Sequence, residues 1–145
     1  MKFKIFLLSL TALAVSLTCF AQETVIPGKN IPHEITSYVA KHFPDQKLIQ
    51  AVRDRDDFKV EYKILLDNRT KLEFNEKKRI KEIDGNAKLP DAVIPSKILS
   101  YVKSNYPNNF ITDWELEGKR KQQIELNNDL TLEFNMNGDF LRIDD

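Results

Sequence analysis

The 145-residue chain has little of what small secreted domains and most enzymes depend on. It holds one cysteine, four glycines, two histidines and one tryptophan. The cysteine, Cys19, has no second thiol to pair with, so the chain can form no internal disulfide. An exported protein without disulfides fits a bacterial periplasm or outer surface better than a small eukaryotic secreted domain, in which cysteine pairs are usual.

The N-terminal segment has the pattern of a secretory signal. It begins with two lysines and continues as an apolar run over residues 5–17, which is shorter than the ~20 residues that a membrane span needs. Small residues at Cys19 and Ala21 then predict cleavage before Gln22. Lipidation of Cys19 is the alternative, but the preceding Ser16-Leu17-Thr18 matches a lipidation motif poorly. We therefore expect a signal peptide over residues 1–21 and a periplasmic or secreted mature protein.

Charge of one sign is also lacking. The chain has 22 basic and 22 acidic residues, and loss of Lys2 and Lys4 with the signal would leave a net charge near −2. A balanced chain has no basic surface for nucleic acid and none for an anionic membrane. We therefore expect no nucleic-acid partner, and no membrane insertion once the signal has been removed.

An internal repeat is the most specific pattern in the rest of the sequence. Ile31-Pro32 recurs 63 residues later as Ile94-Pro95, with a similar helix-length segment after each. Further on, the block Leu-Glu-Phe-Asn at residues 72–75 recurs 60 residues later at 132–135. Ordered matches at both ends predict two tandem copies of one unit. Their boundaries are expected at residues 31–85 and 94–145, with residues 86–93 as a linker.

Each copy begins with an apolar stripe at helical spacing and continues with alternating apolar and polar residues. The stripe of the first copy consists of Ile31, Ile35, Tyr38, Val39 and Phe43. Strands are expected near residues 47–54, 58–66, 70–75 and 79–84, and near 110–117, 121–127, 130–135 and 139–144. One helix followed by about four antiparallel strands in each repeat predicts an α+β fold with both helices on one sheet face. Because each copy is small, we expect the two to share one long sheet.

These motifs resemble the PepSY-like family of envelope proteins, whose fold is related to that of the β-lactamase inhibitor protein. The resemblance covers nearly all of the mature chain. It rests on the Ile-Pro openings, the helix ends at Phe43-Pro44 and Tyr106-Pro107, the repeated Leu-Glu-Phe-Asn block and the turn at Gly138. It implies a periplasmic binding or inhibitory module. Lys78 stands where the pattern has a turn glycine, so we expect a wider or looser turn there.

No catalytic or metal-binding constellation is visible in the sequence. His33 and His42 lie nine residues apart on one helix and point to opposite sides, so they cannot share a metal. The acidic segment at residues 54–57 lacks the glycine and the late glutamate of a calcium loop and is expected to be a hairpin tip. We therefore expect no cofactor and no enzymatic activity. The alternatives are an envelope structural or carrier protein, which would need an apolar cavity, and a hydrolase with an unrecognised site.

The sheet face without helices is the broad surface that this architecture offers to a partner. Trp114 has two interpretations, a core residue or an exposed aromatic residue on that open face. The candidate protein-binding residues are Lys59, Glu61, Lys63, Lys71, Glu73, Trp114, Gln123, Glu125 and Glu133. We expect charge reversals such as Lys63→Glu or Glu133→Lys to leave the fold intact, as solvated positions usually do. The sequence thus predicts a non-enzymatic module that binds, and inhibits or senses, another envelope protein.

Overall fold

The computed structural model describes residues 22–56 and 59–144, so the expected signal peptide and its cleavage site lie outside the described residues. The first part of the chain forms β1 (Gln22–Val25), a 3-10 turn η1 (Gly28–Asn30), helix α1 (His33–His42), β2 (Leu48–Asp56), β3 (Lys59–Leu66), β4 (Lys71–Phe74) and β5 (Ile80–Asp84). The second part forms η2 (Asp91–Val93), helix α2 (Ser96–Asn105), β6 (Ile111–Glu117), β7 (Lys121–Leu126), β8 (Thr131–Asn135) and β9 (Phe140–Asp144).

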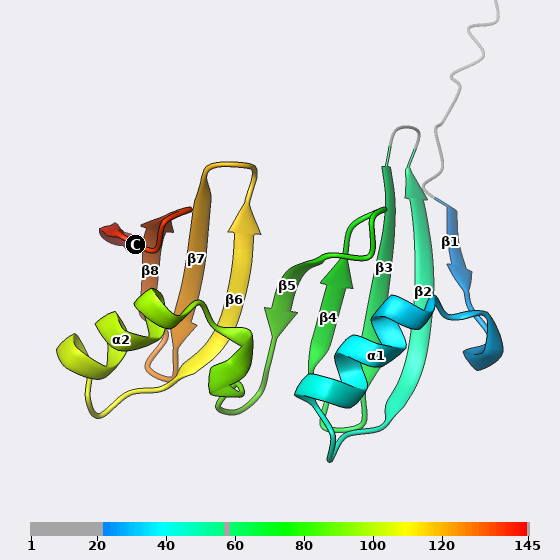
Figure 1. Cartoon of the computed structure of the whole chain (residues 1–145), viewed down its shortest axis with the longest axis horizontal. Helices are drawn as coiled ribbons and strands as arrows, with labels where there is room; N and C mark the ends of the chain where they lie inside the picture. The colour runs from blue at the N-terminus through cyan, green and yellow to red at the C-terminus, as the bar shows by residue number, and fades with distance from the viewer. Residues whose placement is uncertain (1–21, 57–58, 145) are drawn as a thin grey trace, which may run out of the picture.

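The described strands make one nine-stranded sheet. Their order in the sheet is their order in the chain, and every neighbouring pair is antiparallel. Both helices lie over the same face, α1 across the first strands and α2 across the last (Figure 1). The prediction of an α+β fold with helices on one face is confirmed, but the count of about four strands per repeat is incomplete. It omits β1, whose four residues Gln-Glu-Thr-Val are too short and too polar to show an alternating pattern.

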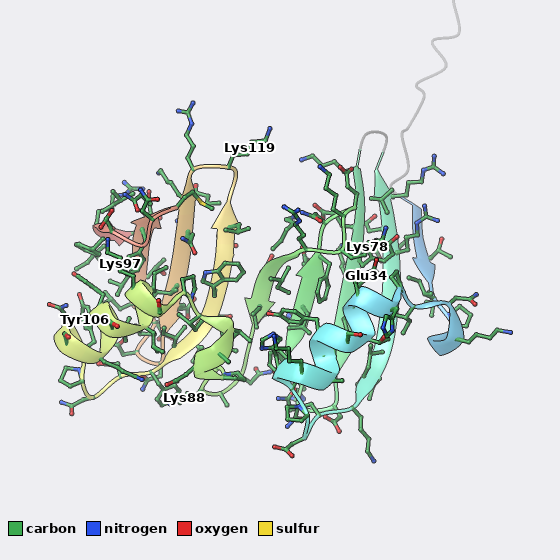
Figure 2. All side chains as sticks on the ribbon, in the orientation of Figure 1. Glu34, Lys78, Lys88, Lys97, Tyr106 and Lys119 are labelled. Atoms are coloured by element: carbon green, nitrogen blue, oxygen red, sulfur yellow. The ribbon has the colours of Figure 1, made fainter. Side chains whose placement is uncertain are left out.

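The two helices start and stop at equivalent prolines. Pro32 and Pro95 stand immediately before α1 and α2, where the fixed φ of proline suits the approach to a helix. An aromatic residue, Phe43 or Tyr106, follows each helix with non-helical φ, since the proline after it disfavours helical geometry there. Lys97 and Tyr106 mark the two ends of α2 (Figure 2). In the described part of the chain, no helix is long and apolar enough to cross a membrane.

A continuous apolar row crosses the sheet beneath the helices. Cross-strand pairing places its members side by side from β2 to β9: Ala51, Ile64, Leu72, Ile83, Trp114, Ile124, Leu132 and Ile143. All except Ile143 are buried. The row passes through the junction of the two repeats, where Ile83 of β5 pairs with Trp114 of β6. One core therefore extends across both repeats.

The segment between the repeats is packed against the sheet. Leu89 is buried, and its N–H donates to the carbonyl oxygen of Ile111 at 2.9 Å. Asp91 in η2 accepts from Lys103 of α2 at 2.8 Å. These contacts fix the expected linker to β6 and α2.

The two β-hairpin turns that differ in sequence have the same form. The Lys78 N–H donates to the carbonyl oxygen of Asn75 at 2.9 Å, and the Gly138 N–H to that of Asn135 at 3.0 Å. Lys78 has φ 59° and Gly138 has φ 78°, so both occupy the left-handed region. The expectation of a wider or looser turn at Lys78 is therefore wrong. The side-chain oxygen of Asn75 accepts two backbone N–H groups, as that of Asn135 does, and holds the turn closed without glycine.

Candidate functional site

The helix-free face carries the side chains that alternate with the apolar row. The strand register places eight of the nine candidate residues on this face, which is the face opposite the buried row. Trp114 is the exception, because it lies in the apolar row and is only 6% exposed. Its indole N–H donates to the side-chain oxygen of the buried Gln122 at 3.1 Å. The core interpretation of Trp114 is thus correct, and its inclusion among the partner contacts is not supported.

Ion pairs fill the part of this face over the first strands. Lys63 lies between Asp54 (2.8 Å) and Glu23 (3.1 Å), and the hydrogen bonds from its ammonium to those two carboxylates raise its pKa. Lys81 contacts Glu61 at 2.7 Å. Lys63 and Lys81 therefore already have carboxylate partners within the sheet, on β1 and β2 for Lys63 and on β3 for Lys81.

A second ion-paired region lies over the last strands. Glu133 is only 1% exposed although it belongs to the helix-free face. Its carboxylate contacts Lys121 and accepts from Arg142 at 2.8 Å, and these two cations lower its pKa, Lys121 more than Arg142. Glu133 is therefore enclosed rather than solvated. The premise that Glu133 is solvated is wrong, and we now expect Glu133→Lys to destabilise the fold, because the change would place three cations together.

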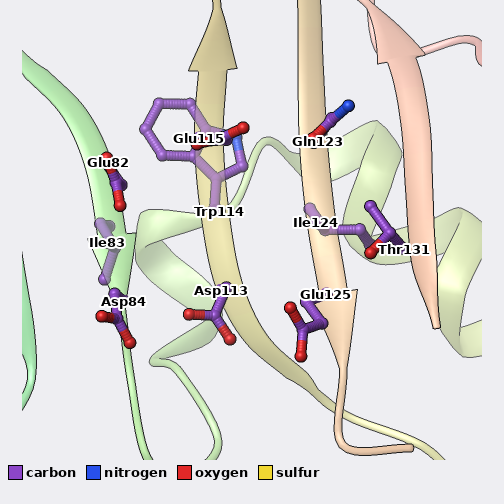
Figure 3. A pocket seen from close by; sticks show the side chains of 10 residues that line it. All are labelled: Glu82, Ile83, Asp84, Asp113, Trp114, Glu115, Gln123, Ile124, Glu125 and Thr131. Atoms are coloured by element: carbon purple, nitrogen blue, oxygen red, sulfur yellow. The ribbon is translucent and has the colours of Figure 1, made fainter. Parts of the chain in front are cut away.

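Between these regions, carboxylates of β5, β6 and β7 lie opposite one another. Glu82 of β5 lies opposite Glu115 of β6, and Asp113 of β6 lies between Asp84 and Glu125 of the adjacent strands. Asp84 is paired with Lys71 at 2.7 Å, but no ion pair within the described chain reaches the other four carboxylates. The group lines an open groove of about 220 Å³. Figure 3 shows its side chains together with the other residues of the groove. We call Glu82, Asp113, Glu115 and Glu125 the central acidic group.

Burial and mutual repulsion change how this group ionises. Burial raises the pKa of Glu82, and the charges of Glu73 and Glu115 raise it further. Burial is also the main cause of the raised pKa of Asp113, with Asp84 and Glu125 adding to it. Like charges directly opposite each other in a sheet destabilise it. Repulsion within the central acidic group therefore lowers the stability of the fold. A cationic ligand would reduce this repulsion.

Sequence reasoning found one of these four carboxylates, Glu125, and missed the others. Glu82, Asp113 and Glu115 meet only because β5 of the first repeat pairs with β6 of the second, a junction that the internal repeat does not specify. The sequence does contain one indication that Asp113 and Glu115 lie on the helix-free face. Asp113 and Glu115 flank Trp114, so assigning the tryptophan to the core places both carboxylates on the opposite face.

The two histidines lie apart from this face, on α1. The ring of His33 is 3.3 Å from the hydroxyl of Ser37 on the same helix. His42 lies against the ring of Tyr38, with 4.5 Å between centroids, and burial and the neighbouring Lys41 lower its pKa. Among the residues that the structure describes, no three His, Cys, Asp or Glu side chains are placed to hold a metal ion.

Two overlapping stretches, residues 18–82 and 60–142, match the family described as "Putative beta-lactamase-inhibitor-like, PepSY-like". Together they cover most of the sequence. The chain belongs to this PepSY-like family. The two matches share residues 60–82, which contain β4 and most of β3 and β5. No curated protein matches the chain significantly.

Three solved structures from Bacteroides are similar to this chain. A "putative periplasmic protein" of the DUF2874 family from Bacteroides vulgatus is 29% identical, with a TM-score of 0.78, and the match covers 85% of this chain and 97% of that one. A "putative calcium-regulated periplasmic protein" from Bacteroides thetaiotaomicron is 27% identical, with a TM-score of 0.79 over the same shares. A third, a "putative periplasmic protein of unknown function" from B. vulgatus, is 28% identical, with a TM-score of 0.79 over 86% and 100%.

Proposed function

We propose that this PepSY-like chain is a non-enzymatic exported module that binds another envelope protein through its helix-free sheet face. The observation that carries the proposal is the central acidic group, which lies between two regions whose charges are already paired. A partner that presents lysine or arginine at this position would neutralise carboxylates that have no ion pair within the described residues.

The electrostatics of the face favour this kind of interaction. Charge complementarity across an interface contributes specificity and association rate more than affinity. The flanking regions, where Lys63 and Glu133 already have partners, would tolerate contact without requiring charges from the partner. The face is therefore expected to favour a partner with basic residues at the centre of its contact surface. Membership of a β-lactamase-inhibitor-like family supports an inhibitory or sensing role.

The test uses a partner captured from envelope extract, purified, and titrated against defined variants. We expect Glu82→Gln with Glu115→Gln to weaken its binding about tenfold or more, since removing charge from a close interfacial pair costs about 1.5 kcal/mol or more. The same wild-type complex should weaken as salt is raised, because screening reduces exposed charge interactions.

The matched control is Glu34→Gln with Glu76→Gln. Both glutamates are exposed and lie away from the face, at the start of α1 and in the β4–β5 turn, and the pair changes the net charge equally. If the two double variants weaken binding equally, the affinity depends only on the net charge of the chain, and the proposal is contradicted. Calcium belongs in the same titration, because one structural neighbour is described as calcium-regulated. If calcium alone stabilises the wild type and not Glu82→Gln with Glu115→Gln, the face binds a cation instead of a protein.

A further inference from the structure

Among the described strands, β9 lies at one edge of the sheet and carries exposed apolar side chains. Leu141 and Ile143 on this strand are 47% and 44% exposed, and Met136 in the preceding turn is 48% exposed. Ile143 is also the only exposed member of the apolar row that crosses the sheet. A strand edge with free backbone groups and apolar side chains is a template for pairing with another strand.

In the first repeat, the strand equivalent to β9 is β5, and its outer edge pairs with a further strand, β6. In β5, Ile83 pairs with Leu72, just as Ile143 pairs with Leu132 in β9, and both strands carry the same register shift one residue earlier in the ladder. Ile83 is 0% exposed, because β6 pairs with the outer edge of β5 through three residue pairs. Ile143 differs from Ile83 in that no strand among the described residues pairs with the outer edge of β9.

We propose that a second copy of the chain fills this edge, with β9 pairing antiparallel to β9 of the other copy around Ile143. A two-fold axis perpendicular to the sheet would relate the copies, so both α2 helices would cover the same face. The apolar row would then continue from one copy into the next through contact between the two Ile143 side chains. This inference does not depend on the partner-binding role of the helix-free face.

The charges of β9 select this register. With both α2 helices on one face, the side chains of two directly paired residues point to the same side of the joined sheet. This holds only if one residue of β9 pairs with the same residue of the other copy, so the two-fold axis must lie midway between these two equivalent residues. Centring on Ile143 places Arg142 opposite Asp144 of the other copy, and Asp144 opposite Arg142. Centring on Arg142 instead would place two arginines opposite each other, and like charges at that position are unfavourable. The Ile143 register also makes three residue pairs, as many as join β5 to β6.

The opposite edge of the sheet lacks this self-complementarity. The β1 strand is four residues long. Centring β1 on Glu23 would place two glutamates opposite each other, and centring it on Thr24 would place Glu23 opposite Val25. The β9 edge is therefore the one expected to join two copies.

The test combines sedimentation with single-cysteine cross-linking of the purified chain in a Cys19→Ser background, which has no other cysteine. We expect the wild type to form dimers whose population rises with protein concentration, and Ile143→Asp to abolish them by opposing two charges. We also expect Ile143→Cys to form a disulfide-linked dimer, since opposite residues of antiparallel strands have Cα atoms about 4.5–5.5 Å apart, within the range of disulfides.

Ile49 supplies the matched controls, because it is an exposed isoleucine on β2, far from β9 in the sheet order. Ile49→Asp should leave the dimer unchanged, and Ile49→Cys should cross-link at least about tenfold more slowly than Ile143→Cys, through random collision only. Circular dichroism checks that each variant is folded. A wild type that stays monomeric at all concentrations, or equal cross-linking of the two cysteine variants, would overturn the proposal. Faster cross-linking of Val25→Cys would also overturn it, by moving the interface to β1.

Discussion

Lys78 and Gly138 show how one backbone geometry is reached with different side chains. Both have positive φ in the same hairpin turn, and an asparagine closes each turn with two backbone hydrogen bonds. A lysine in the left-handed region carries a cost of roughly 1 kcal/mol that glycine avoids. The first repeat therefore holds backbone strain that the second does not, and this difference can be measured.

We expect Lys78→Gly to raise the free energy of unfolding by about 0.5 kcal/mol, because relief of strain exceeds the extra entropy that glycine gives to the unfolded chain. Gly138→Ala should lower it by about 1–2 kcal/mol. There a Cβ would lie 3.0 Å from the Cβ of Lys97, in addition to the positive φ. Urea unfolding of the two variants checks both signs. A loss of stability in Lys78→Gly would show that the lysine side chain itself stabilises the turn.

A second prediction at this scale concerns Glu133, which lies between Lys121 and Arg142. Its pKa is lowered from 4.5, and a carboxyl with a depressed folded-state pKa stabilises the fold above its unfolded value. Glu133→Gln should therefore unfold at a lower temperature than the wild type at pH 7, and the difference should shrink as pH falls below 4.5. Glu73→Gln is the matched change in the first repeat, where Lys81 is more distant at 4.0 Å, and should have a smaller effect. Equal melting temperatures at pH 7 would contradict a stabilising role for Glu133.

At the scale of elements, local patterns predicted most of the structure and topology supplied the rest. Strands β2 to β9 and both helices follow from spacing, since alternating and helical periods depend only on neighbours along the chain. The strand β1 could not be found this way, because its four residues have no apolar alternation. The central acidic group was also largely missed, since it depends on β5 and β6 from different repeats lying side by side. The enclosure of Glu133 had no local signal either, because Lys121 and Arg142 come from neighbouring strands.

The junction strands β5 and β6 carry a prediction of their own. Glu82→Gln with Glu115→Gln removes two opposed charges and should raise the free energy of unfolding at pH 7 by about 0.5 kcal/mol. The raised pKa of Glu82 means that the folded state keeps its proton at higher pH than the unfolded state, so the wild type loses stability as pH rises above 4.5. The double variant should show a smaller loss over that range. Thermal unfolding from pH 4.5 to pH 7 checks this.

A stabilised variant that also loses partner binding would show that the central acidic group is retained for function at the expense of stability. If the variant is less stable than the wild type at pH 7, the carboxylates stabilise the junction, and the central argument for a cationic partner is lost. Glu34→Gln with Glu76→Gln again serves as the control for net charge.

At the scale of the whole molecule, the sheet joins the two repeats into one structure. The apolar row runs through Ile83 and Trp114 without a break, and Leu89 packs the connecting segment onto the sheet. Two units that share a core should unfold together, because neither buries enough surface alone. This matters for binding, since the central acidic group exists only while β5 and β6 remain paired.

Ile64→Ala tests this coupling, because Ile64 lies in the first repeat and the only tryptophan of the chain, Trp114, lies in the second. Removing the buried side chain of Ile64 should cost about 2–5 kcal/mol. If the repeats unfold as one unit, the urea midpoint reported by Trp114 fluorescence should fall by as much as the midpoint from circular dichroism, which reports on both repeats. Ile124→Ala, the same kind of change beside Trp114 in the second repeat, is the control that must move both signals. If the fluorescence midpoint of Ile64→Ala stays at the wild-type value, the second repeat folds independently. The central acidic group would then not be held together by a core that both repeats share.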